Sequence, residues 1–134
     1  QPIAYISGKI SRDEYIQAYR PEYASFQYAN QNLSKNSRIL GLNIGNRGYY
    51  SNIDIVFDIK ILHQIAANVT CAEHIVEKLR EKNITHILVK FSHFNYWVNT
   101  YSLHERKILK DFFDNFVIME FSKDDFGLLR LKQK

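Results

Sequence analysis

The sequence predicts an α/β domain of three layers, in which helices cover both faces of a mainly parallel sheet and an antiparallel β-hairpin closes the chain. Short apolar runs typical of strands, such as residues 84–91, alternate with segments whose apolar residues recur at helical spacing. Strands that alternate with helices favour parallel pairing. Two further strand-like runs, 116–121 and 126–131, flank the polar stretch 123–125, which is typical of a hairpin loop.

The first part of the chain predicts two consecutive helices. After a lead-in over residues 1–10, Ser11 and Glu14 have the spacing of a capping box, in which two side chains bond the free backbone amides of a helix start. Pro21 interrupts this helix because proline has no amide hydrogen, and it suits the first turn of a second helix. One stripe of that second helix consists of Tyr23, Phe26, Asn30 and Leu33.

The middle of the chain predicts two strands followed by two helices. The strands are expected over 38–44 and 53–57, the second with an alternation typical of a half-buried strand. Asp58 is expected to cap a short helix. Residues 70–73, Thr-Cys-Ala-Glu, have the spacing of another capping box, and Asn83 is expected to end the helix that follows in the left-handed conformation.

The last part predicts a buried strand, a loop, a helix and the hairpin. Residues 84–91 are almost continuously apolar, which indicates burial on both faces of the sheet. Residues 92–101, rich in aromatic and amide side chains, are expected to form a loop. Ser102 and Glu105 form a third capping box, which opens a helix ahead of the hairpin.

Size and charge bound the kind of protein. The 134 residues fit one domain, 1–134, and the net charge is +4. Basic residues are interleaved with acidic ones, as in residues 77–82, so we expect a solvated helix face there and no nucleic-acid partner. No segment has the roughly 20 apolar residues of a membrane span. Because the chain opens on Gln1 and not on methionine, we expect a piece of a longer protein or a processed one.

The glycine turn Gly45-Asn46-Arg47-Gly48 is the first candidate binding site. Ligands of α/β sheets commonly lie at the carboxyl ends of strands, and this turn follows a predicted strand. The guanidinium of Arg47 can bind a phosphate or a carboxylate through two hydrogen bonds, and Tyr49 and Tyr50 follow it. The alternative is a plain tight turn with an exposed arginine.

The aromatic segment 92–101 is the second candidate site. Its aromatic rings can stack on a sugar while its amides bond the sugar hydroxyls, and tyrosine and tryptophan also suit a membrane interface. The alternative is a loop that folds its aromatic rings onto the core. The candidate ligand-binding residues here are Asn95, Tyr96, Trp97 and Tyr101.

No catalytic or metal-binding residue is predicted. The five histidines show no spacing typical of zinc ligands, and we expect no cofactor in this domain. Cys71 and His74 share a helix face, but a catalytic pair would also need an orienting group and an oxyanion hole. Caps and turns account for most of the aspartates.

The ordered set of segments resembles the C-terminal, extracytoplasmic domain of bacterial polytopic glycosyltransferases of the dolichyl-phosphate-mannose–protein mannosyltransferase type. Four pieces carry the resemblance, which extends over most of the chain. They are Ser7 to Ile16, Tyr28 to Leu33, Ser37 to Tyr50 with the sequence SRILGLNIGNRGYY, and Asn83 to Val89 with the sequence NITHILV.

The resemblance implies a function for the parent protein and a supporting role for this domain. The parent would transfer a sugar from a polyprenyl-phosphate donor at the extracytoplasmic face of the bacterial cytoplasmic membrane. In that family the catalytic acid lies in a loop of the membrane part, so this domain would be non-catalytic. Its partners would be the membrane-embedded part of the same chain and a glycan or lipid-linked sugar. The alternatives are a free-standing small-ligand or nucleotide-binding module and a protein-interaction domain.

Overall fold

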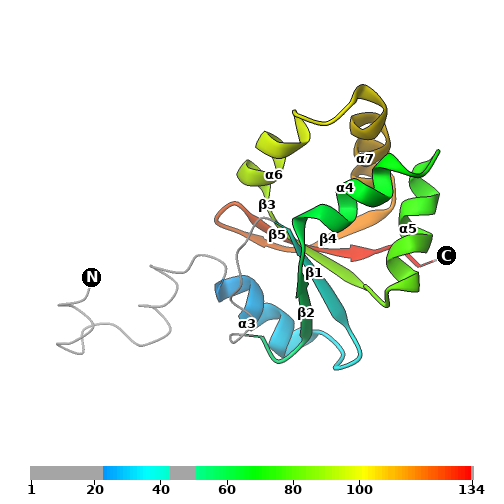
Figure 1. The fold of residues 1–134 in the computed structure, drawn as a ribbon. Helices are drawn as coiled ribbons and strands as arrows, with labels where there is room; N and C mark the ends of the chain where they lie inside the picture. The colour runs from blue at the N-terminus through cyan, green and yellow to red at the C-terminus, as the bar shows by residue number, and fades with distance from the viewer. Residues whose placement is uncertain (1–22, 43–50, 134) are drawn as a thin grey trace.

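The computed structural model describes residues 23–42 and 51–133 as one five-stranded sheet with five helices (Figure 1). The predicted helix after Ser11 and the glycine turn lie outside the described residues. In chain order the elements are α3 (Tyr23–Asn32), β1 (Arg38–Leu42), β2 (Asp54–Phe57), α4 (Ile59–Ala67), α5 (Ala72–Glu81), β3 (His86–Lys90), α6 (Phe91–Val98), α7 (Leu103–Asn115), β4 (Val117–Lys123) and β5 (Phe126–Leu131).

The sheet is mixed, with the strand order β2-β1-β3-β5-β4. Strand β1 pairs in parallel with both β2 and β3, whereas β5 pairs antiparallel with β3 and with β4. The α/β class and the closing hairpin are confirmed, but the expectation of a mainly parallel sheet is not. The hairpin contributes β5 as a direct neighbour of β3, so antiparallel pairs are as frequent as parallel ones within the described sheet.

Helices cover both faces of the sheet. Helices α4, α5 and α7 pack on one face against strand residues such as Leu40, Ile87 and Leu129. Helix α3 packs on the opposite face, where Phe26 meets Ile39 and other strand residues (Figure 1). The first four residues of β3 are all buried, which confirms the prediction that both faces of this strand are covered.

Several ends of helices and strands form as their residues predict. The carboxylate of Asp58 accepts from the Lys60 amide at 2.8 Å and caps α4. Asn83 has φ 62° and ends α5, where the next amide, that of Ile84, donates to the Leu79 carbonyl at 3.0 Å. Ser102 forms its capping box at the start of α7. The β4–β5 turn places two aspartates at positive φ, as a two-residue hairpin turn requires.

Two local predictions are wrong. The residues Thr70-Cys71-Ala72-Glu73 form no capping box, because α5 begins at Ala72 and Cys71 occupies the N-cap position without a side-chain cap hydrogen bond. The segment 92–101 is not an open loop, since most of it lies in helix α6. The reason for this helix lies in the hairpin turn.

Candidate functional site

Helix α6 is held at its start by the turn between β4 and β5. The Phe91 amide donates to the Asp125 carbonyl at 2.9 Å, and the Ser92 amide lies 3.2 Å from both carboxylate oxygens of Asp125. The first amides of a helix have no partner within the helix. Lys90, at the N-cap position, makes no side-chain hydrogen bond to them, and Asp125 supplies the acceptor instead. The capping residue Asp125 thus follows Ser92 by 33 positions in the chain.

Helix α6 has an aromatic inner side and an aromatic outer side. Phe91, Phe94 and Val98 are half-buried and pack against the larger core cluster, where Phe94 meets Phe113 edge-on at 5.2 Å. On the outer side, Tyr96 is 67% exposed and Trp97 is 47% exposed. The helix contains no fully buried residue, so it lies at the surface of the domain.

A hollow of about 300 Å³ lies between α4 and the carboxyl end of α6. Helix α4 contributes Lys60 and His63, and the other side consists of Trp97, Thr100 and Tyr101. Both the amide and the hydroxyl of Thr100 donate to the Trp97 carbonyl, at 3.0 and 2.6 Å, which ties the chain back onto the last turn of α6. The hollow therefore combines a cation, an imidazole, a hydroxyl and two aromatic rings.

His63 and Tyr101 form one wall of this hollow, and Glu105 bonds His63 from outside it. The rings of His63 and Tyr101 stack in parallel, with centroids 3.8 Å apart and planes inclined by 6°. His63 Nε2 lies 3.1 Å from the carboxylate oxygen Oε1 of Glu105, which also accepts from the Ser102 amide at 2.9 Å. Glu105 thus positions His63, which stacks on Tyr101 to form an aromatic wall.

The surroundings of Glu105 and Tyr101 shift the pKa values of both side chains. The Ser102 amide holds the pKa of Glu105 below its ordinary value, and the bond to His63 adds to this effect against the opposing effect of burial. Burial raises the pKa of Tyr101, and the negative charge of Glu105 raises it further. Glu105 is thus a carboxylate and Tyr101 a neutral phenol at neutral pH.

The structure brings together two of the four candidates predicted in the aromatic segment. Trp97 and Tyr101 line the hollow, whereas Asn95 and Tyr96 are exposed on the same helix and are not among its lining residues. The predicted site residues Arg47, Tyr49 and Tyr50 lie outside the described residues.

Sequence reasoning missed Lys60 and His63. The cap at Asp58 predicts the helix that carries both residues, but no local signal shows that α4 faces the end of α6. This proximity follows from the tertiary fold, because residues 40 positions apart meet only after the sheet forms. Within 23–42 and 51–133, no group of three or more His, Cys, Asp and Glu side chains gathers as metal ligands would.

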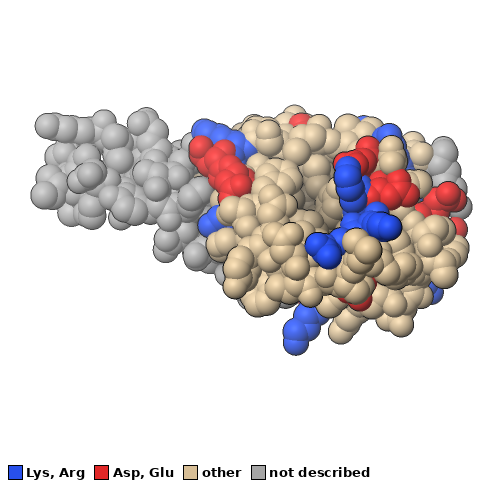
Figure 2. Space-filling view, turned by 90° about the horizontal axis from the view of Figure 1, so that it is seen from above, with Lys and Arg blue, Asp and Glu red and all other residues tan. Residues whose placement is uncertain are grey.

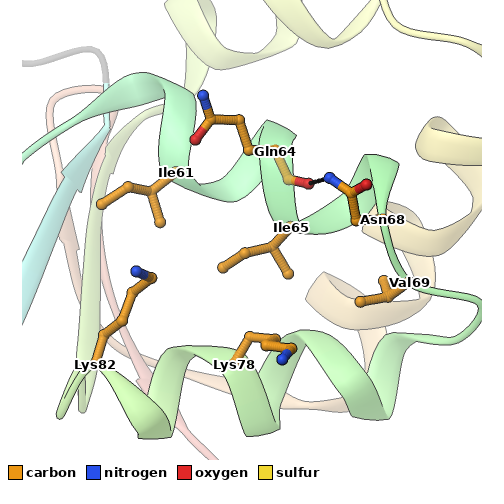
Figure 3. A pocket seen from close by; sticks show the side chains of 7 residues that line it. All are labelled: Ile61, Gln64, Ile65, Asn68, Val69, Lys78 and Lys82. Atoms are coloured by element: carbon orange, nitrogen blue, oxygen red, sulfur yellow. Dashed lines mark hydrogen bonds between the residues drawn. The ribbon is translucent and has the colours of Figure 1, made fainter.

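A second hollow, of about 240 Å³, lies between α4 and α5 (Figure 3). Ile61 and Ile65 of α4 point toward α5 (Figure 3). Lys82, the residue that follows α5, points back across the gap, whereas the side chain of Lys78 runs along α5 (Figure 3). This groove has an apolar floor and lysine side chains, but no aromatic ring lines it. It therefore lacks the stacking surface that distinguishes the hollow beside Trp97.

A polar cluster lies on the opposite, α3-covered face of the sheet. His86 is buried on β3, and its Nδ1 lies 2.7 Å from the Thr85 hydroxyl. Its Nε2 lies 3.7 Å from the Glu120 carboxylate, too far for a hydrogen bond, while Arg130 Nε is 3.3 Å from the same oxygen. A bulge in β4 between Met119 and Phe121 gives Glu120 this position.

Comparisons of the chain with protein-family models, with curated proteins and with solved structures found no match. No helix among the described residues is long and apolar enough to cross a membrane.

Proposed function

We propose that the chain is a non-catalytic domain of a membrane glycosyltransferase and that it binds a saccharide in the hollow between α4 and α6. One observation carries the saccharide proposal: the half-exposed indole of Trp97 borders a hollow that also contains Lys60 and Thr100. An indole face offers apolar area against which the apolar face of a sugar ring packs. The ammonium and hydroxyl groups provide the hydrogen bonds that fix its orientation.

The bonding of the polar groups in the hollow supports a binding role over a catalytic one. The imidazole of His63 stacks on Tyr101 and bonds Glu105, and the hydroxyl of Thr100 donates to a backbone carbonyl. Nucleophilic catalysis needs a nucleophile within hydrogen-bond reach of its base. No such pair is recorded among the residues that line this hollow.

The parent activity rests on the resemblance of the sequence to the tail of bacterial polytopic mannosyltransferase-type enzymes. In this proposal the membrane-embedded part of the same chain transfers the sugar at the periplasmic side of the membrane, and the domain recognises the acceptor or supports the active site. Reading the gene upstream of Gln1 tests this part. Several apolar spans of about 20 residues would support it, and a start codon close to Gln1 would overturn it.

Fluorescence of Trp97, the single tryptophan of the chain, tests saccharide binding directly. We expect the emission to shift when the protein is titrated with methyl glycosides and short oligosaccharides, with saturation in the millimolar range. The amide NMR signals of Thr100 and Tyr101 should move at the same concentrations. Unchanged emission and unchanged amide signals across the panel would overturn the proposal.

Two variants separate binding in the hollow from contact with an aromatic side chain elsewhere. Trp97→Ala removes the stacking surface and should abolish the saccharide-induced shifts of Thr100 and Tyr101. Tyr96→Ala is the matched control, because Tyr96 is an exposed aromatic residue of the same helix that does not line the hollow. Equal loss of binding in both variants would count against the hollow as the site.

A further inference from the structure

Three exposed apolar side chains on the outer side of α6 and at the start of α7 make up what we call the aromatic face. It consists of Tyr96, Trp97 and Leu103, exposed by 67%, 47% and 60%. These are three of the five large apolar side chains that are exposed among the described residues, and they lie within eight positions of the chain. Clustered exposed apolar residues mark an interaction surface, whereas isolated ones do not.

The aromatic face belongs to a stretch without charged residues. Residues 91–103 contain no Asp, Glu, Lys or Arg, although 24% of the whole chain is charged. Figure 2 views the molecule from the side of α6 and α7 and shows a broad uncharged area with charged groups toward its two sides. A surface with this composition can lose its water without stripping any ionised group.

Positive charges border the aromatic face. Arg106 and Lys107 are exposed and follow Leu103 by three and four residues, so they share its side of α7. Lys60 borders the same hollow as Trp97. The nearby acid Glu105 has a side chain only 15% exposed and bonds His63 and the Ser102 amide. Beside the hollow and along α7 the border is therefore basic and complements a negatively charged partner, whereas the exposed Asp124 and Asp125 lie at the other end of α6.

We infer that the aromatic face docks on a lipid bilayer that contains anionic headgroups. Helix α6, about 12 Å long from its eight residues, lies in the plane of the interface, with Tyr96, Trp97 and Leu103 at the boundary between headgroups and acyl chains. Tryptophan and tyrosine favour this depth because each has an apolar ring and a polar tip. Arg106, Lys107 and Lys60 then meet the lipid phosphates.

This inference goes beyond saccharide binding and does not depend on it. Bilayer docking would hold the hollow beside Trp97 at the height of the headgroups. A saccharide attached to a membrane lipid would then lie within reach of the domain.

Vesicle binding by the full chain tests the inference. We expect the protein to sediment with vesicles of phosphatidylcholine and phosphatidylglycerol, and to bind severalfold more weakly to phosphatidylcholine alone or at high salt. Lipids that carry a nitroxide near the headgroup should quench Trp97 more strongly than lipids labelled at the end of the acyl chain. This pattern would place the indole at the interface.

Paired substitutions show whether the aromatic face is responsible. Tyr96→Ser and Leu103→Ser should each lower the affinity for anionic vesicles severalfold, and both residues lie outside the hollow. Ile118→Ser and Met119→Ser are the matched controls, because these side chains are 39% and 49% exposed on β4. Arg106→Gln with Lys107→Gln should reduce the preference for anionic over neutral vesicles.

Three outcomes would overturn the inference. The first is no binding to anionic vesicles, and the second is equal loss of binding in the β4 controls. The third is self-association in the absence of lipid that Leu103→Ser abolishes, because the face would then bind a second copy of the chain. Saccharide titration without vesicles reports on the proposed function separately, so either proposal can fail while the other stands.

Discussion

The carboxylate of Asp125, in the turn between β4 and β5, lies 3.2 Å from the amide of Ser92 through both oxygens and also accepts from the Ser92 hydroxyl. Asp125 adopts φ 71°, a left-handed conformation that the hairpin turn requires. One residue thus closes the hairpin and caps α6. The position of α6, and with it of Trp97, depends on the hairpin.

Asp125→Gly should destabilise the start of α6 while leaving the turn intact. Glycine removes the carboxylate but also accepts the positive φ without strain, so we expect a net loss of about 0.5 kcal/mol in the free energy of unfolding, at the low end for a lost helix cap. Urea unfolding measures this loss, and hydrogen exchange of the α6 amides should accelerate with it. Asp124→Gly is the matched control, because Asp124 also has positive φ, at 53°, and no recorded hydrogen bond to α6. Equal destabilisation by the two variants would contradict the capping role.

Acidification should weaken the capping box at the start of α7, in which Glu105 accepts from the Ser102 amide. The folded-state pKa of Glu105 is lowered, mainly by the Ser102 amide, so its carboxylate stabilises the fold above the unfolded-state pKa. This stabilisation is lost as the pH falls through the folded-state pKa. The free energy of unfolding, measured from pH 7 downward, should therefore decrease more steeply in the native chain than in Glu105→Gln. Parallel curves for the two proteins would exclude this contribution.

His86 should give a separate loss of stability at a higher pH. Burial lowers the pKa of His86 below 6.5, because desolvation outweighs the attraction of Glu120. The unfolded chain therefore binds a proton that the folded chain resists, and stability falls as the pH drops through 6.5 toward the lower folded-state pKa. NMR titration of the His86 ring measures that pKa. A His86→Gln variant should lose this part of the pH dependence, and a ring that titrates at or above 6.5 would refute the prediction.

Gly127→Ala should disturb the contact between strand β5 and the start of helix α6. A Cβ at Gly127 would overlap the far edge of the Phe91 ring and come within 3.1 Å of the Met119 sulfur. We expect a cost of about 1–3 kcal/mol, typical of overpacking, and altered Trp97 emission as α6 shifts. Adding Phe91→Leu to Gly127→Ala removes most of the overlapping ring, so the double variant should regain part of the lost stability. No recovery in the double variant would show that the strain lies elsewhere.

Much of the fold follows from local sequence. The existence of β3, the caps at Asp58 and Ser102, the stop at Asn83 and the closing hairpin were predictable, because each depends on residues within a few positions of one another. The predicted strand 84–91 was too long, since β3 spans His86–Lys90 and Phe91 already belongs to α6. Apolar patterning and turn chemistry act over this short range. The capping box expected at residues 70–73 failed because α5 begins one residue later than that box requires, with Cys71 and not Thr70 as the N-cap.

The candidate site was predictable only in part. Trp97 and Tyr101 could be predicted as binding residues because aromatic rings interleaved with amides are unusual in a short segment. Lys60 and His63 could not, because their relevance depends on α4 lying beside the end of α6.

The sequence alone determined the α/β class, the order of the five strands and the position of an uncharged aromatic segment. The tertiary structure decided that the sheet is mixed, that the aromatic segment is largely helical and that His63 meets Tyr101 and Glu105. The physical reason is the distance along the chain over which each interaction acts. Propensities, caps and turns act between near neighbours in the chain, whereas the cap from Asp125 and the wall of the hollow join residues that only sheet formation brings together.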